Sequence, residues 1–461
     1  MLVFAAALCA APLYGHSDEV DSHTYTVLAR HMAETGRWLD SGYLPSIFYR
    51  FREHLPFGIW PFALTTLMFG ERGLAPLALI FSLGTLSIML LTGTRVFGRS
   101  AALVGVLVLS TTDSFFQTAG RVHLDNLLLL LTTASTLPLW APDRIAPARW
   151  AFSAALSSLA VLVKGPFGLL PLVATTFARA ITVRSAREIA SGGLAALAAL
   201  LPAAIFLAYD ALLGEGTWWH GYVVDQIYAS ARGLRGYGAA DLMPLTSLAG
   251  RFWPALPLSL WGMALGLRDL VRRRATAVAV TAAHVSIGLG LLWLPTRKLP
   301  HHNFVLYPAL ALLAGAAVAP AVGHLVASPA RRRAAAAALV ALAAGTAVAS
   351  LAGAGAFLTP RSCVIPARLG ASVPRGADVL VVAPGKDWIA IAALAAEYGL
   401  NGWPARFLEG DIPLEASPPG SGPRDPGRRA MFALVRADVP AGAHAGWQER
   451  AREANWTLWT R

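Results

Sequence analysis

Two carboxylates and a histidine follow the first apolar run of the chain. The run "MLVFAAALCAAPLY" leads within a few residues to "EVDSHTY", which contains Glu19, Asp21, His23 and Tyr25. A carboxylate held close to a reacting hydroxyl can accept its proton, which is general-base catalysis. Two interpretations remain open, a solvated acidic loop and a catalytic base at a membrane surface.

More polar residues follow at the ends of later apolar runs. The segment "YRFREHLPF" contains Glu53 and His54, and "GRVHLDN" contains Arg121 and Asp125. A histidine without a clear second ligand is usually structural, so a divalent cation is conceivable at His54 but not supported. Arg121 and Asp125 are four residues apart and can pair on a helix. A structural ion pair and the wall of an active site explain them equally well.

A lysine lies inside an apolar stretch in "VLVKGPFGLLP". Lys164 is followed directly by Gly165 and Pro166, which interrupt a helix. A lysine at membrane depth is costly, so a functional role is the default interpretation, and a snorkelling residue at a helix end is the alternative.

Four basic or titratable residues crowd the segment "LPTRKLPHHNF". They are Arg297, Lys298, His301 and His302. The topology below places them on the outer face of the membrane, against the usual distribution of positive charge. A phosphate at the membrane surface is the simplest reason, because guanidinium and ammonium groups bind phosphate oxygens strongly.

The elements that must position these residues are transmembrane helices. Of the 461 residues, 56% are hydrophobic and 14% are charged, whereas ordinary globular domains carry about 25% charged residues.

The run 55–70 is short and begins with prolines, which suits a re-entrant or interfacial helix or one further span. The apolar N-terminal run lacks the charged start of a signal peptide, so we favour a first span with a trimmed or misassigned start. The predicted spans are 1–14, 73–97, 101–119, 123–140, 150–163, 166–182, 190–211, 252–267, 276–295, 303–325 and 335–357.

The positive charge is concentrated in the short links between these spans. Five links (95–100, 141–150, 179–188, 268–275 and 327–334) hold 14 Lys or Arg in 42 residues, and the long loops 15–56 and 212–251 hold 7 in 82. This asymmetry predicts a cytoplasmic N-terminus with the long loops outside. The net charge of +12 therefore needs no nucleic-acid partner. Cys9 and Cys363 indicate neither a metal site nor a disulfide framework.

The composition changes after the last span. Residues 358–461 hold 12 basic and 10 acidic residues, and "DVLVVA" and "AMFALVRA" are typical of strands, whereas "WIAIAALAAEYG" is typical of a helix. The predicted fold is an all-α polytopic membrane protein of about 11–13 transmembrane helices, formed by residues 1–357. A small α/β extracytoplasmic domain at 358–461 follows it.

Four of these motifs, in this order, resemble one family. "DxxxYxxLAxxMxxTGxW" in the first outer loop, "E-x-x-P", "KGP" at a helix break and "KLP…YPALALL" are similar to elements of the GT-C glycosyltransferases over about residues 15–325. The chain resembles the branch that uses polyprenyl-phosphate sugars, with protein O-mannosyltransferases and lipid A aminoarabinose transferases. His54 stands where the family has lysine, Ser22 replaces an acid, and Gln226 stands where some aminoarabinose transferases have a metal-binding histidine.

The resemblance implies roles for these residues. Asp21 takes the position of the catalytic aspartate, and Lys298 that of the lysine used on the donor's lipid phosphate. The implied catalytic residues are Asp21, Glu19 and Glu53; the implied phosphate-binding residues are Lys298, Arg297, His301, His302 and Lys164; the implied cavity residues are Tyr25, His54, Arg121 and Asp125.

The implied activity is inverting sugar transfer from a polyprenyl phosphate to an acceptor on the outer face of the cell (inner) membrane. No cofactor is implied with certainty. The expected partners are the lipid-linked donor, a lipid, glycan or protein acceptor, and membrane lipids. Two other classes remain open, a transporter or flippase of lipid-linked sugars and an enzyme like the O-antigen ligases or polymerases. Matched halves would favour the transporter, and a pyrophosphate-linked donor would favour the ligase.

Overall fold

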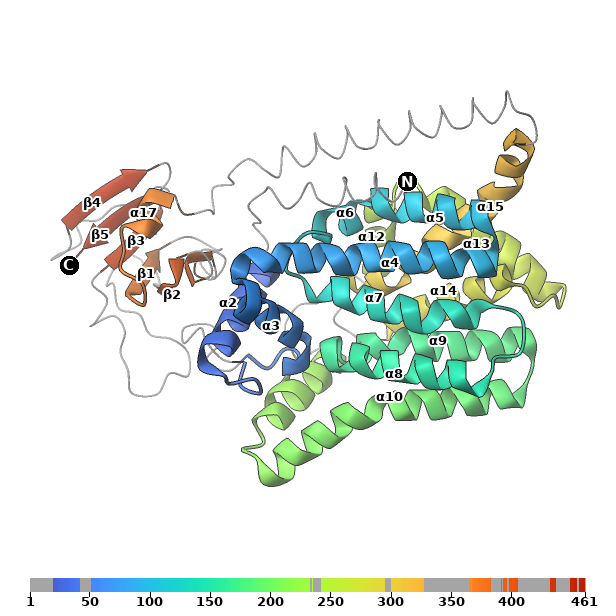
Figure 1. Ribbon diagram of the computed structural model, residues 1–461, viewed down its shortest axis with the longest axis horizontal. Coiled ribbons are helices and arrows are strands. Elements are labelled where there is room, and N and C mark those ends of the chain that lie inside the picture. Colours follow the sequence, from blue (N-terminus) through green and yellow to red (C-terminus); the bar gives the residue numbers. More distant parts are fainter. Residues whose placement is uncertain are drawn as a thin grey trace. The chain divides into compact units, whose positions relative to one another are not determined.

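The computed structural model describes most of the helical part of the chain (Figure 1). Two compact units contain these residues, and each is described by itself. The first unit holds residues within 52–58 and 75–326, and the second holds those within 20–51, 59–74 and 365–460. The described residues are 20–41, 51–232, 234, 242–294, 300–326, 365, 367–382, 391, 393–395, 398–404, 432–436, 448–453 and 456–460.

The first unit is a bundle of α-helices joined by short links. Four segments are long and apolar enough to cross a membrane: Glu71–Phe97, Pro166–Val183, Ala186–Leu213 and His301–Val322. The α-helices are α4 (Leu74–Phe97), α5 (Arg99–Thr111), α6 (Asp113–Thr118), α7 (Leu124–Thr136), α8 (Pro147–Lys164), α9 (Pro166–Val183), α10 (Ala186–Leu213), α11 (Ala229–Ala231), α12 (Met243–Arg251), α13 (Leu256–Val271), α14 (Ala277–Trp293) and α15 (Tyr307–Val326). Shorter helical turns are η2 (Pro56–Gly58), η4 (Leu137–Trp140), η6 (Pro300–Leu306) and the π-helix η5 (Trp219–Tyr228).

Most predicted spans match these helices within a few residues, and the predicted class of polytopic helical membrane protein is confirmed. One predicted span, 101–119, is wrong as a single helix. The chain is extended at Thr112 (φ −70°, ψ 128°), which separates α5 from α6. Serine, threonine and aspartate compete with helical hydrogen bonds, and "STTDS" concentrates them here. The predicted spans 1–14 and 335–357 lie outside the described residues.

Small residues allow the helices to approach closely. A methyl group built on Gly315 of α15 would overlap the backbone of α5, and one on Gly262 of α13 would overlap the backbone of α15. Lipid chains are as apolar as leucine side chains, so close backbone packing is a main source of helix association in a membrane. The apolar core runs along these contacts and includes Phe252, Leu310 and Leu313.

A buried ion pair joins α9 to α10 at one end of the bundle. Arg179 Nε donates to Glu188 Oε2 at 2.7 Å, and the same guanidinium donates to the backbone carbonyls of Leu139, Ala141 and Asp143. Arg179 is fully buried. Arg179 was predicted to lie in the link 179–188, whereas it lies inside α9 and holds the α7–α8 link against the bundle. Its charge is therefore structural.

The second unit contains two packed helices, α2 (Val20–Thr35) and α3 (Trp60–Phe69), preceding the 3-10 turn η3 (Glu71–Gly73). The Trp60 indole N–H donates to the Trp38 carbonyl at 2.8 Å, and Arg30 pairs with Glu71. The ten residues of α3 extend about 15 Å, half of the hydrocarbon thickness of a bilayer. α3 is therefore too short to cross alone, which leaves the re-entrant or interfacial helix of the alternatives for 55–70.

The same unit contains a five-stranded sheet in the order β2-β1-β3-β5-β4. β1 lies parallel to β2 and β3, and β5 lies antiparallel to β3 and β4. The strands predicted at "DVLVVA" and "AMFALVRA" are present as β1 and β3, and residues 393–395 of the predicted helix are helical. The bounds are α17 (Ala367–Ala371), β1 (Asp378–Val382), β2 (Asn401–Pro404), β3 (Phe432–Arg436), β4 (Gln448–Glu453) and β5 (Trp456–Thr460).

Candidate active site

The break between α8 and α9 lies at one end of the first unit. α8 ends at Lys164, Gly165 adopts φ +57° and ψ −131°, and Pro166 starts α9. Proline is well tolerated in a first helical turn because no backbone N–H is needed there. Glycine accepts a positive φ that disfavours other residues. The "KGP" motif is therefore a helix reversal that leaves Lys164 at the very end of α8.

Lys164 makes an ion pair with Asp125 of α7. Its Nζ lies 2.6 Å from Asp125 Oδ1, and both side chains are about 95% buried. Asp125 lies in the first turn of α7, where a negative charge is favoured by the helix dipole. His123 Nδ1 lies 3.0 Å from the other carboxylate oxygen, Oδ2, and 3.3 Å from the Asp125 backbone N. Three titratable groups thus meet at the start of α7.

The short helix η6 brings two more histidines to this end. His301 is close enough to Asp125 and Lys164 to interact with their charges. The His302 ring packs on Phe167, directly after the break, with ring centroids 4.3 Å apart. The segments predicted separately from "GRVHLDN", "VLVKGP" and "LPHHNF" therefore converge at one end of the unit.

A π-helix follows α10 and covers the same break. Asp210, in the last turn of α10, accepts hydrogen bonds from the backbone N–H groups of Trp218 and Trp219 at 2.8 and 3.0 Å. This carboxylate fixes the turn that starts η5. Tyr222 of η5 is 96% buried, and a methyl group built on Gly165 would overlap its hydroxyl. Burial raises the pKa of the Tyr222 phenol, so that the side chain is neutral at physiological pH.

Gly165→Ala tests this contact. We expect a loss of about 1–3 kcal/mol of stability, because alanine is strained at positive φ and its methyl group displaces Tyr222. Thermal unfolding in detergent measures it. In a Tyr222→Phe background the loss should be smaller, since the overlapping hydroxyl is gone.

Gly193→Ala is the matched control for this substitution. Gly193 lies inside α10 with open space around its Cα, so alanine there should be neutral or slightly stabilising. Equal losses for Gly165→Ala with and without the Tyr222 hydroxyl would contradict the contact.

The segment before η2 is tied to the π-helix. The Arg52 guanidinium lies 4.1 Å from the centre of the Trp218 ring and donates to Thr217 Oγ1 at 3.3 Å. Gln226 Nε2 donates to Glu53 Oε1 at 3.3 Å. Glu53 was predicted as a catalytic acid, and its contact with Gln226 ties the segment before η2 to η5. His54 is half-buried beside it.

Other predicted site residues belong to the second unit or fall outside the described residues. Asp21 and Tyr25 are on α2 of the second unit, where Tyr25 is buried and packs edge-on against Phe51. Glu19, Arg297 and Lys298 lie outside the described residues.

Arg121 and Asp125 do not share a helix, so the i,i+4 pairing that their spacing would allow on a helix does not form. Arg121 lies in the link before α7. Its backbone carbonyl accepts a hydrogen bond from Asn126 Nδ2 at 3.2 Å. The helix starts only at Leu124, because His123 takes the extended conformation of an N-cap residue. The partner found for Asp125 is Lys164, 39 residues away.

Several residues of this end were not predicted as site residues. His123 lies in the motif "GRVHLDN", two residues before Asp125, and this spacing was the signal that could have identified it as a site residue. Asp210, Trp218 and Tyr222 carried no local signal, because their roles depend on how η5 folds back onto α8 and α9. Within the described ranges, no group of three or more His, Cys, Asp or Glu is placed to hold a metal ion.

The chain matches known proteins in its structure. No protein-family model matches, and no curated protein matches. The architecture is the fold of solved structures to which the chain has low sequence identity.

Solved structures with this fold include ArnT from Cupriavidus metallidurans bound to undecaprenyl phosphate. It has a TM-score of 0.73 and 15% identity, covering 99% of this chain and 97% of that one. The apo state of ArnT gives 0.72, again at 15% identity and covering 99% and 97%. The oligosaccharyltransferase AglB from Archaeoglobus fulgidus, in complex with an inhibitory peptide and a dolichol-phosphate, gives 0.56 at 13% identity, covering 95% and 69%. At these identities the likeness shows the fold alone.

Proposed function

We propose that the protein is an integral-membrane glycosyltransferase that takes a sugar from a polyprenyl phosphate. The observation that carries this proposal is the convergence of Lys164, His301 and His302 at one end of a bundle with the GT-C fold. Two solved structures with this fold hold undecaprenyl phosphate and dolichol-phosphate. Cationic and hydrogen-bonding side chains are what a lipid phosphate requires.

The proposed reaction proceeds with inversion on the outer face of the membrane. Asp21 accepts the proton of the acceptor hydroxyl, and the acceptor oxygen forms a bond to the anomeric carbon. The bond from that carbon to the phosphate oxygen breaks, and the lipid phosphate leaves with the electron pair. The transition state resembles an oxocarbenium ion. A lipid phosphate is a good leaving group, so no general acid is needed.

The cations act on the leaving phosphate. Arg297 and Lys298, three to four residues before His301, are proposed to offset its developing charge. Lys164 is paired with Asp125, and the carboxylate offsets part of the positive charge that the lysine would present to the phosphate. Its proposed role also includes stabilising the helix break.

The test is release of polyprenyl phosphate by purified protein in lipid nanodiscs. Undecaprenyl-phosphate-linked mannose, glucose and 4-aminoarabinose are suitable donors, each with a mixture of envelope lipids as acceptors. We expect one donor to yield free undecaprenyl phosphate together with a sugar-bearing product. The control is Lys298→Ala, which should insert normally and release little.

Movement of the donor across vesicle membranes without release of undecaprenyl phosphate would instead identify a transporter. Release from pyrophosphate-linked donors only would favour the ligase class.

A further inference from the structure

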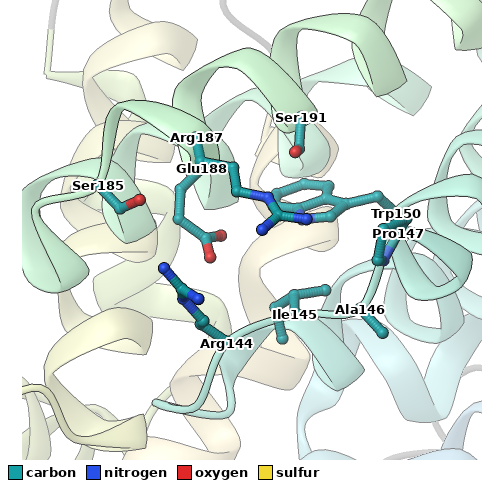
Figure 2. Close-up of a pocket in the computed structure, with 9 residues that line it drawn as sticks. All are labelled: Arg144, Ile145, Ala146, Pro147, Trp150, Ser185, Arg187, Glu188 and Ser191. Carbon is teal, nitrogen blue, oxygen red and sulfur yellow. The ribbon is translucent and has the colours of Figure 1, made fainter.

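A cavity lies at the opposite end of the same helices from the candidate active site. α7 and α8 run antiparallel, so the α7–α8 link is far along the bundle from Lys164. The cavity has a volume of about 240 Å³ and is lined by this link, the start of α8 and the start of α10 (Figure 2). It shares no residue with the candidate active site.

Two arginines give this cavity a positive charge. Arg144 and Arg187 line it, and within the described part of the chain neither guanidinium has a hydrogen bond or an ion pair with another side chain. Glu188 also lines the cavity, but its carboxylate accepts from the fully buried Arg179 at 2.7 Å. Asp143, nearby, contributes a backbone carbonyl to Arg179 and is not part of the lining. Arg144 and Arg187, whose side chains are exposed, are therefore the lining residues whose charge no carboxylate of the lining pairs with.

The remaining lining suits a small anion with an apolar neighbour. Ser185 and Ser191 supply hydroxyl groups, and the buried Trp150 forms an apolar wall (Figure 2). α10 begins directly after Ser185, and α8 begins at Pro147 in the lining, so the positive ends of two long helix dipoles add to the arginines. Guanidinium groups match the oxygens of phosphate in pairs.

We propose that this cavity binds a phosphate-bearing anion, either the headgroup of an anionic phospholipid or a soluble phosphate ester. The sequence predicts that the links 141–150 and 179–188 face the cytoplasm, so the anion comes from that side. The site is separate from the proposed transfer reaction, and its test needs no activity measurement.

Binding of three soluble probes to the full-length protein in detergent tests this proposal. The probes are glycerol phosphate, dihexanoyl phosphatidylglycerol and, as the zwitterionic comparison, dihexanoyl phosphatidylcholine. We expect saturable binding of one or both anionic probes and weaker binding of phosphatidylcholine. Arg144→Ala with Arg187→Ala should lower the affinity about tenfold or more, because two charge-assisted contacts are lost.

The matched control removes two arginines from another short link. Arg272→Ala with Arg274→Ala makes the same change in net charge, and both residues are exposed outside the cavity. Its affinity should equal that of the wild type. Should the first double variant fail to fold, Ser191→Phe keeps both arginines and fills the cavity, and it should also prevent binding.

The two anionic probes distinguish the sources. Binding of phosphatidylglycerol alone supports a lipid headgroup, and binding of glycerol phosphate shows that the phosphate ester suffices. Absence of binding by both, or equal affinities of the wild type and the cavity variants, would overturn the proposal.

Discussion

Asp21→Asn is expected to reduce sugar transfer by about 10²–10⁴-fold while the protein still inserts and folds. The amide keeps the size of the side chain but cannot accept the acceptor's proton. Asp21 lies in the first turn of α2 and is half-buried, and the helix-dipole part of the cost of removing its charge is about 0.3–1 kcal/mol. The rate of release of undecaprenyl phosphate measures the effect.

Glu34→Gln is the matched control for this prediction. Glu34 lies at the other end of the same helix and is exposed, so its change from acid to amide should leave transfer unaltered. The assignment of Asp21 as the base would be refuted by wild-type rates in Asp21→Asn at saturating donor and acceptor.

Lys164→Met is the second substitution for which we expect a large effect. It leaves the Asp125 carboxylate buried without its ammonium partner, which typically costs about 3–5 kcal/mol. We expect a large drop in the unfolding temperature and a loss of transfer of about 10²-fold or more. A fall in activity alone would not separate a site role from a folding role.

A variant without either charge separates the two roles. Asp125→Asn combined with Lys164→Met removes the uncompensated carboxylate, so most of the stability should return. If Lys164 also acts on the donor, transfer should remain low in this stable double variant. Wild-type transfer in it would show that Lys164 serves the structure only, and Lys164→Arg then should be nearly neutral.

The sequence predicted most of the long helices of the first unit, because these are apolar runs bounded by charge, but it missed the break between α5 and α6 and the helix α12. It also predicted the helix break at Lys164, since Gly165 and Pro166 have strong local preferences. The partner of Asp125 was not predicted. Local spacing offered Arg121, but the packing of α7 on α8 supplied Lys164.

Two other parts could not be predicted for different reasons. The π-helix η5 depends on Asp210 capping a turn eight residues later, a contact that no periodicity reveals. Strand β4, "QERARE", has no apolar alternation, because it is an exposed edge strand. Edge strands commonly carry charge, which prevents pairing with other chains.

The short helix α3 has a consequence for the proposed base. Its residues Leu64, Leu67, Met68 and Phe69 are 46–70% exposed, a surface that suits the boundary between lipid chains and headgroups. α2 packs on α3 within one compact unit. Because α2 and α3 belong to one unit, an interfacial position of α3 would fix the height of Asp21 relative to the membrane surface, and with it the height at which the acceptor must present its hydroxyl.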